Sequence, residues 1–292
     1  MVEIRTSRPE EADAQKDLWK AAFGDDERYI DWFYECCWKP EDSLLLLEDG
    51  ELASMLSLLP QTVVLPDGST ASAWYIYALA TDPAARSKGY GRQLLHYVDF
   101  HLRAREADCA TVVPAEPSLF KFFGMVGFSP CFSTRKVEVL KNMLSPKAPE
   151  DLAEPVEPEA YNAIRERLLE GTAGVRYGTE LIRYQQGLGA MSGAGLFRVV
   201  AGGVEGCAAA EYVGPDSVLL KELLLPPDKM ARGLAALAPL LPGERYHVRT
   251  PAGWEGLPGS YLQPFGMIKW YDRNKEALLR KSDHGYMGLG FD

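Results

Sequence analysis

The sequence predicts an α/β protein with a mixed sheet, in which one order of strands and helices is built twice. Three predicted strands between residues 43 and 81 are joined by the turns Asp49-Gly50 and Asp67-Gly68, a pattern typical of an antiparallel meander. Helical periodicity flanks this meander on both sides. After a proline-rich stretch, a similar order of elements reappears. Together these observations indicate helices packed on a mixed sheet, in tandem.

The elements of the first half can be assigned in chain order. Val2–Thr6 alternates as a short strand, and the helix after it begins at Pro9 and ends at Gly24. A second helix runs from about Asp26 to Trp38. The meander strands are Ser43–Glu48, Glu51–Leu65 and Thr70–Thr81. After them we expect a helix from about Gly89 to Ala107, a buried strand at Cys109–Pro114, a short helix at Ser118–Val126 and a strand at Phe132–Leu140.

The second half repeats this order after a segment, 142–156, whose prolines and acidic residues are typical of a linker. Its expected helices are Glu157–Leu169, Thr179–Gly187 and Met230–Leu241, and its extended segments are Leu196–Val200, Glu205–Tyr212, Ser217–Leu225, Tyr246–Thr250 and Pro264–Tyr271. A short echo supports the repeat, because Phe123–Val126 (FGMV) returns as Phe265–Ile268 (FGMI). We therefore predict a first domain at 1–141, the linker at 142–156 and a second domain at 157–292.

The composition is ordinary for a packed protein, with 47% hydrophobic and 25% charged residues in 292. No apolar run approaches the roughly 20 residues of a membrane span, and the N-terminus lacks the apolar core of a signal peptide. The five cysteines are scattered without metal-ligand spacing, so we expect reduced thiols, no metal site and a cytoplasmic protein. The net charge of −10 argues against nucleic-acid binding. The oligomeric state is left open.

A glycine-containing turn between a strand and a helix is the feature that carries chemistry. Glycines at 89 and 91 would let the backbone approach a ligand closely, and the first N–H groups of the helix would then face an anion such as a pyrophosphate. Lys88 and Arg92 could add charge at the rim of this nest. The alternative is that the glycines serve the turn geometry alone. The pattern is neither GxGxxG nor a P-loop.

Two motifs together make the first half resemble the GNAT superfamily of N-acetyltransferases. Residues 86–91 read R-x-x-G-x-G after a strand that ends L-A-T-D-P, similar to the GNAT acetyl-CoA signature. About thirty residues later, Glu116–Phe128 resembles the second signature of that superfamily. With a second, degenerate GNAT-like half, the chain resembles the Eis-like acetyltransferases, but we expect no sterol-carrier-like domain, for which 292 residues leave no room.

The resemblance implies direct acetyl transfer from acetyl-CoA, as co-substrate, to a primary amine of a small molecule or peptide. Backbone groups of Leu79, Ala80 and Thr81 would pair with the pantetheine arm, and amides of residues 87–92 would hold the pyrophosphate. The cofactor-binding residues that it implies are Leu79, Ala80, Thr81, Arg86, Ser87, Lys88, Gly89, Tyr90, Gly91, Arg92 and Phe123. The second half, with Pro226 and Pro227 at the matching place, should bind no cofactor and should wall the acceptor cleft.

The sequence departs from the family pattern at the general acid. The usual tyrosine is replaced by Phe123, whose ring cannot protonate a departing thiolate. Tyr77, expected to share a face with Leu79, could supply the missing hydroxyl, although such strand aromatics are more often half-buried packing residues. Glu116 could receive the amine proton, or it could be only a carboxylate at a helix N-terminus.

Two other functions stay open at this point. The loss of the tyrosine is compatible with a pseudoenzyme that binds CoA or senses a ligand. A tandem GNAT-like protein could also transfer another acyl or an aminoacyl group, although the intact R-x-x-G-x-G argues against it. Turnover of acetyl-CoA with a panel of amines distinguishes the acetyltransferase from the pseudoenzyme. Nothing in the sequence identifies the acceptor.

Overall fold

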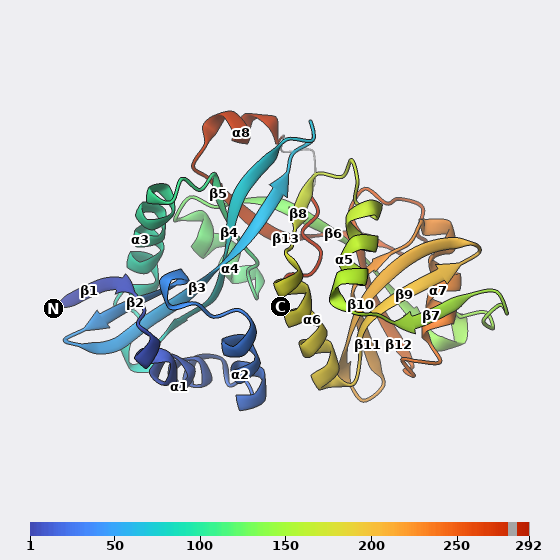
Figure 1. Ribbon diagram of the computed structural model, residues 1–292, viewed down its shortest axis with the longest axis horizontal. Helices are drawn as coiled ribbons and strands as arrows, with labels where there is room; N and C mark the ends of the chain where they lie inside the picture. Colours follow the sequence, from blue (N-terminus) through green and yellow to red (C-terminus); the bar gives the residue numbers. More distant parts are fainter. Residues whose placement is uncertain (280–284, 292) are drawn as a thin grey trace. The chain divides into compact units, whose positions relative to one another are not determined.

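The computed structural model describes residues 1–279 and 285–291 and divides into two compact units (Figure 1). Unit 1 is built from Met1–Val63, Thr70–Pro130 and Met267–Leu279. Unit 2 is built from Val64–Ser69, Cys131–Gly266 and, within the described residues, 285–291. Each unit has a mixed sheet with helices packed on it, so the predicted α/β class is confirmed. Among the described residues, no helix has the length and apolar character needed to span a membrane.

The sheet of unit 1 follows the predicted meander. Its strands stand in the order β1-β2-β3-β4-β5-β13, where β4 and β5 are parallel and the other pairs with a known register are antiparallel. Their bounds are β1 Val2–Thr6, β2 Ser43–Glu48, β3 Glu51–Val64, β4 Thr70–Thr81, β5 Cys109–Val112 and β13 Tyr261–Trp270.

Helices cover both faces of this sheet. They are α1 Ala12–Phe23, α2 Glu27–Cys36, α3 Tyr90–Ala104, α4 Pro117–Gly124 and α8 Arg273–Leu278. The apolar stripe of α3, which includes Leu94, Leu95 and Val98, packs with α4 against one face. On the other face, Trp19 of α1 and Phe33 of α2 pack against Tyr77 of β4. The end of β4 therefore lies between the α3 and α4 layer on one face and the α1 and α2 layer on the other.

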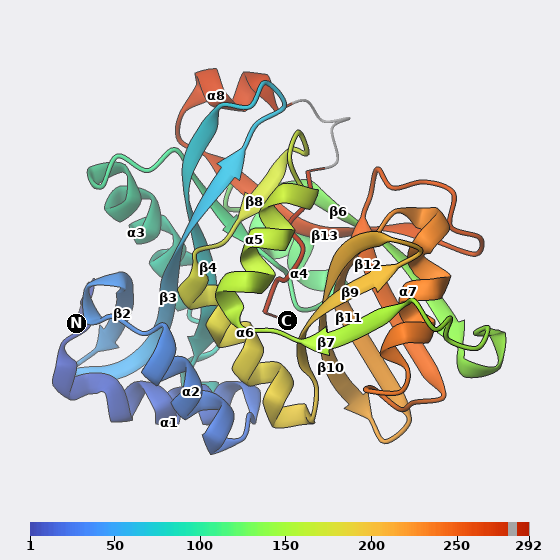
Figure 2. The same cartoon turned by 45° about the vertical axis from the view of Figure 1, so that its right-hand side comes forward.

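The strands of unit 2 stand in the order β6-β12-β11-β10-β9-β7. The strands are β6 Ser129–Leu140, β7 Leu152–Pro155, β9 Gly195–Ala201, β10 Val204–Gly214, β11 Ser217–Leu224 and β12 Arg245–Pro251; β8, Gly174–Arg176, lies outside this order. Its helices are α5 Pro158–Leu168, α6 Thr179–Ser192 and α7 Met230–Leu237. Residues 285–291 run beside α6, as both views show, and the ring of Phe291 packs on Tyr184 of that helix (Figures 1 and 2).

The predicted division of the chain needs correction in three places. β6, expected at the end of the first domain, belongs from Cys131 onward to unit 2, where its register with β12 is antiparallel. The predicted linker contains β7, which pairs with β9. The chain also returns to unit 1 at residues 267–279, because β13 runs through both units and its end pairs with β5. The β6–β12 and β13–β5 pairings join residues more than a hundred positions apart and the β7–β9 pairing joins residues more than forty apart, distances that local patterns do not report.

The sequence echo does not mark equivalent positions. Phe123 and Gly124 end α4, whereas Phe265–Ile268 lies within β13. The same letters therefore serve a helix end in one place and a strand in the other. Residues 280–284 and 292 of the predicted second domain lie outside the described residues.

Candidate functional site

The end of β4 separates from its neighbour β5. Their parallel register joins Ala73–Tyr75 to Cys109–Thr111, after which β4 continues to Thr81 while β5 ends at Val112. The backbone groups along the last part of β4 are therefore beyond the β5 register. An edge of this kind can pair with an extended ligand in the way that it would pair with an added strand.

A left-handed residue near this edge decides which side chains face which layer. Ala78 has φ 50°, which for a non-glycine residue within a strand has the effect of a β-bulge. Before it, Tyr77 packs on the α1 and α2 layer; after it, Leu79 packs on the α3 and α4 layer. The expectation that Tyr77 and Leu79 share a face is therefore wrong, because the bulge shifts the alternation by one residue.

The loop after β4 leaves backbone donors at the start of α3. Its path uses left-handed conformations at Ser87, φ 68°, and Gly89, φ 78°, the residue that caps α3. The N–H of Gln93 donates to the carbonyl of Gly89 at 3.0 Å. The N–H groups of Tyr90, Gly91 and Arg92 come before this bond and belong to the first turn, which has no carbonyl partner within the helix. They form a donor set suited to an anion.

A cavity of about 600 Å³ brings the loop, the β4 edge and α4 together. Nine of the eleven cofactor-binding residues predicted from the sequence line it, namely Leu79, Thr81, Arg86, Ser87, Gly89, Tyr90, Gly91, Arg92 and Phe123. Three more lining residues were not predicted: Ala85, Leu119 and Phe122. The apolar spacing of Leu119, Phe122 and Phe123 on one helical face was the signal that could have identified α4 as a wall.

The two other predicted residues have partners of their own. The carbonyl of Ala80 accepts a hydrogen bond from Ser54 Oγ at 2.6 Å. The Nζ of Lys88 lies 2.7 Å from Glu48, and this hydrogen bond raises the pKa of Lys88 and lowers the pKa of Glu48. The Lys88 ammonium group thus pairs with the end of β2 and does not line the cavity, which corrects the expectation for Lys88, whereas Arg92 does line the cavity.

Gly91 lies where a side chain would enter the cavity. A Cβ atom at this position would be 3.6 Å from Thr81 Oγ1 and 3.9 Å from Phe122, both of which line the cavity. These are ordinary contact distances, so the protein itself tolerates the atom. A larger side chain at Gly91 would consequently occupy ligand space without disturbing the fold.

The far wall of the cavity is aromatic and carries no proton donor. Phe123 is only 4% exposed and packs edge-to-face on Phe122 and Phe128, with ring centroids 5.2 and 5.7 Å away. A buried phenyl ring can exclude water from a ligand and can contact it. It cannot transfer a proton, as the sequence already indicated.

The two predicted catalytic residues lie in different settings. Tyr77 is buried among Trp19, Phe33 and Tyr75, and its hydroxyl lies 2.9 Å from the hydroxyl of Tyr29. Glu116 is exposed immediately before α4, and its carboxylate accepts a hydrogen bond from Ser118 at 2.6 Å. Neither is among the described residues that line the cavity. The setting of Glu116 favours the role of a helix N-terminal carboxylate.

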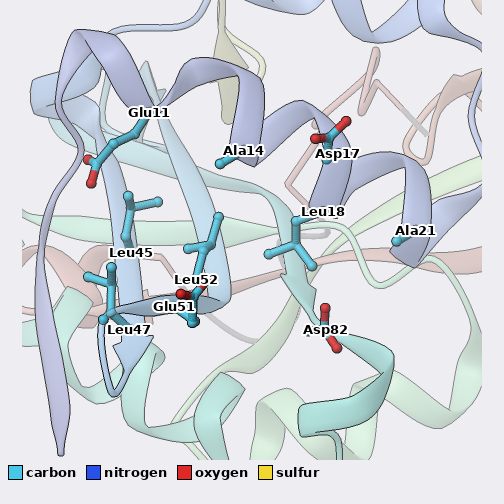
Figure 3. Close-up of a pocket in the computed structure, with 11 residues that line it drawn as sticks. Glu11, Ala14, Asp17, Leu18, Ala21, Leu45, Leu47, Glu51, Leu52 and Asp82 are labelled. Atoms are coloured by element: carbon cyan, nitrogen blue, oxygen red, sulfur yellow. The ribbon is translucent and has the colours of Figure 1, made fainter.

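A second hollow, of about 460 Å³, lies between α1 and the β2–β3 hairpin (Figure 3). Leucines form its floor, and the carboxylates of Glu11, Asp17, Glu51 and Asp82 are at its edge. Glu11 is already paired with Arg5 at 2.5 Å, which lowers its pKa, and Asp82 caps the short turn at Ala84. This hollow was not predicted. Among the described residues no group of three or more potential metal ligands is found, there or elsewhere.

Comparisons with known proteins agree with this geometry. The family model of the acetyltransferase (GNAT) domain matches residues 3–129. A probable N-acyltransferase from Enterococcus faecalis V583 has a similar structure, with a TM-score of 0.74 at 13% identity over 94% of this chain and 74% of that one. No curated protein matches the sequence.

Two further solved structures extend the likeness. Eis1 from Mycobacterium abscessus has a TM-score of 0.67 at 14% identity, covering 93% of this chain and 74% of that chain. A putative acetyltransferase from Pyrococcus horikoshii has a TM-score of 0.60 at 13% identity, covering 99% and 95%. At these identities the likeness concerns the fold, and it spans both units.

Residues 3–129 therefore form a GNAT acetyltransferase domain, and by this domain the protein is an N-acetyltransferase. The resemblance predicted from the two motifs is confirmed, and so is the tandem, Eis-like arrangement of the whole chain.

Proposed function

We propose that unit 1 binds acetyl-CoA in the cavity between β4, α3 and α4 and transfers its acetyl group directly to a primary amine. The observation that carries the proposal is the cavity itself. It joins the first-turn N–H groups of α3, a strand edge and an aromatic wall within one space. These three parts match the pyrophosphate, the amide-bearing arm and the thioester of that co-substrate in order.

Each part would make a different kind of interaction with the co-substrate. The amides of Tyr90, Gly91 and Arg92 would hold the pyrophosphate, with the guanidinium groups of Arg86 and Arg92 adding charge. The β4 edge at Leu79 and Thr81 would pair with the amides of the pantetheine arm, while Ala80, whose carbonyl accepts from Ser54, would not pair through that carbonyl. Phe122 and Phe123 would cover the thioester and keep water from it.

The transfer would rest on positioning and proton movement. The amine nitrogen attacks the thioester carbonyl carbon, the C–S bond breaks, the nitrogen loses one proton and the sulfur leaves as a thiolate that must be protonated or solvated. Phe123 contributes no proton. We propose Tyr77, which lies two residues beyond the end of the β4–β5 register and has a partly buried hydroxyl, as the residue that exchanges a proton with the reacting groups. Glu116 stays a second candidate for the amine proton, with the exposed setting described above.

A cytoplasmic location belongs to the same proposal. A second function is favoured by one specific observation, which is the phenyl ring of Phe123 in place of the family's acid: a protein that binds CoA as a sensor and turns over slowly or not at all.

One experiment separates the two functions. Purified protein is incubated with acetyl-CoA and a panel of aliphatic, aromatic and peptide amines, and free CoA thiol is measured together with binding by calorimetry. Binding with amine-dependent thiol release supports the enzyme. Binding without release by any amine supports the sensor, and no binding contradicts both.

A further inference from the structure

A buried hydroxyl group on β3 reaches the last residues of β4. Ser54 is fully buried, and its Oγ atom lies 2.6 Å from the carbonyl oxygen of Ala80 and 2.9 Å from Oγ1 of Thr81. A carbonyl oxygen has no hydrogen, so the single hydroxyl hydrogen of Ser54 lies in the shorter contact. The hydrogen in the longer contact then comes from Thr81, which therefore donates to Ser54.

The direction of this bond determines what Thr81 offers to the cavity between β4, α3 and α4. Thr81 is partly buried and lines that cavity. A threonine hydroxyl has one hydrogen and two lone pairs, and the hydrogen is already used toward Ser54. Thr81 can therefore accept a hydrogen bond from an N–H or O–H group of a ligand, but it cannot donate one to a phosphate oxygen.

The backbone of Thr81 faces the open edge of β4. The N–H of Asp82 donates to the carbonyl of Ala53 on β3 at 2.9 Å. The carbonyl of Ala80 also points toward β3, where it accepts from Ser54. Because backbone groups of successive residues point to opposite sides of a strand, those of Thr81 point away from β3. The backbone and the hydroxyl of Thr81 can thus both contact an extended ligand at this edge.

The hydroxyl of Thr81 lies next to the first turn of α3. A Cβ atom built on Gly91 would be 3.6 Å from Oγ1 of Thr81. Phosphate oxygens accept hydrogen bonds, so the N–H groups of the first turn attract a diphosphate, whereas a hydroxyl that only accepts does not pair with one. These two neighbours therefore favour opposite partners: the diphosphate at the N–H groups of α3, and a donor group of the attached arm at Thr81.

We propose that the Thr81 hydroxyl accepts a hydrogen bond from the donor group of the arm that lies nearest the diphosphate, and that Ser54 is the positioning residue that keeps Thr81 an acceptor. The inference rests on the proposed function and adds to it the point along acetyl-CoA at which the diphosphate ends and the arm begins. Ser54 touches no ligand in this arrangement and acts through Thr81. Neither hydroxyl meets the reacting atoms, so the effect falls on affinity and KM and spares kcat.

The test removes one hydroxyl group at a time. The variants are Thr81→Val, Thr81→Ser, Ser54→Ala and, as control, Ser57→Ala. Ser57 is buried on the same strand as Ser54, and its hydroxyl lies 3.2 Å from that of Ser43. Neither Ser57 nor Ser43 is among the described residues that line the cavity. Two ligands are titrated by calorimetry: acetyl-CoA, and the nucleotide part of CoA, which keeps the diphosphate and lacks the arm.

The two ligands should respond differently. Thr81→Val should weaken acetyl-CoA binding about fivefold, the size expected for one neutral hydrogen bond, and should leave the affinity for the nucleotide part unchanged. Thr81→Ser keeps the hydroxyl and should bind both ligands as the parent does, and so should Ser57→Ala. Ser54→Ala should lose affinity for acetyl-CoA alone, and the double variant should be no weaker than Thr81→Val. Equal losses for both ligands, or losses that add in the double variant, would overturn the proposal.

A measurement without ligand tests the part of Ser54 by itself. In protein labelled with ¹³C at threonine Cβ, exchange of the Thr81 hydroxyl hydrogen with solvent is followed through the isotope shift in mixed H₂O and D₂O. The exchange should be slower in the parent than in Ser54→Ala, and equal exchange would overturn the positioning role. If the parent binds neither ligand, the proposed function and the inference fail together. A parent that binds acetyl-CoA no more tightly than Thr81→Val overturns the inference alone.

Discussion

Glycines have opposite roles in the two units near corresponding segments, the one after β4 in unit 1 and the one after β11 in unit 2. In unit 1 the glycines after β4 leave space, and a cavity lies over them. In unit 2 the segment after β11 contains Leu225, fully buried, between Gly206 of β10 and Gly233 of α7. A Cβ atom at Gly206 would lie 2.6 Å from the Leu225 side chain, and one at Gly233 would lie 2.3 Å from it. Glycine in unit 2 admits a side chain of the protein, whereas in unit 1 it leaves room for a ligand.

The opposite face of each sheet shows a second difference. Each unit has one parallel pair of strands, β4 with β5 in unit 1 and β11 with β12 in unit 2. The residue two positions after the last residue of this register is Tyr77 in β4 and Glu222 in β11. Glu222 is fully buried and accepts hydrogen bonds from Arg165 at 2.8 Å and Tyr161 at 2.7 Å. Burial, and then the charge of Glu222, raises the pKa of Tyr161 well above its usual range. Unit 2 thus places an ion pair in its core where unit 1 has a phenol.

The C-terminal segment closes over this ion pair. Gly288 has φ 71°, and a Cβ atom there would lie 2.3 Å from the Glu222 carboxylate and 2.9 Å from the Arg165 guanidinium. The carbonyl of Met287 accepts from Tyr177, and Phe291 packs on the same ring. In unit 2 the glycines and the buried ion pair are therefore part of the core, whereas in unit 1 the glycines after β4 leave a cavity open. Four predictions test this difference.

The largest effect is expected from Glu222→Ala. The change would leave the Arg165 charge buried without its partner, which typically costs about 3–5 kcal/mol in the free energy of unfolding. Glu205→Ala is the matched control, because Glu205 also accepts from two arginines, Arg198 and Arg167, but at a partly exposed site. The control should lose about 1 kcal/mol or less. Urea unfolding measures the free energy of unfolding of both variants. Equal losses would show that the buried pair stabilises the fold no more than the Glu205 pairs do.

Leu225→Ala should cost nearly as much and should still create no ligand site. Removing a buried leucine costs about 2–5 kcal/mol. Pro226 and Pro227 follow directly and have no N–H to offer an anion, so the variant should bind one acetyl-CoA per chain, the same stoichiometry that we predict for the parent. Calorimetric titration gives the stoichiometry. Two sites in either protein would mean that the loop of unit 2 binds phosphate after all.

Gly91→Val should act on the ligand and spare the fold. Its side chain would enter the cavity beside Thr81 and Phe122, so we expect at least a tenfold loss of acetyl-CoA affinity, about 1.4 kcal/mol. Lys88→Ala should change the affinity little, since Lys88 is paired with Glu48. Calorimetry with unchanged unfolding curves is the check. Full affinity in the valine variant would remove the helix N-terminus from the proposed site.

The smallest effect is expected from Phe123→Tyr. If Tyr77 already moves the proton, an added hydroxyl at Phe123 should leave kcat within about twofold of the parent, whereas a missing acid would be revealed by a gain of 10²-fold or more. Steady-state rates with the best amine of the panel decide between the two. A large gain would show that Tyr77 is not the acid and would favour the sensor that lost its chemistry.

Much of this molecule could be predicted from its sequence, because the relevant signals are local. Periodicity identified the helices and strands of unit 1, and the Asp-Gly turns joined the meander. The spacing of Arg86, Gly89 and Gly91 after a strand placed a nest at the start of α3, where the structure has a cavity. These features depend on residues within one turn or one strand of each other, so a single sequence contains them.

The tertiary structure alone decided the rest. The bulge at Ala78 moved Tyr77 to the face opposite Leu79, because one left-handed residue reverses every later side chain of a strand. The partners of Lys88, Tyr77 and Arg165 are 40, 48 and 57 residues away, and β13 finds β5 across more than 150. Pairings over such distances are selected by the packing of the whole chain, and no local pattern carries them.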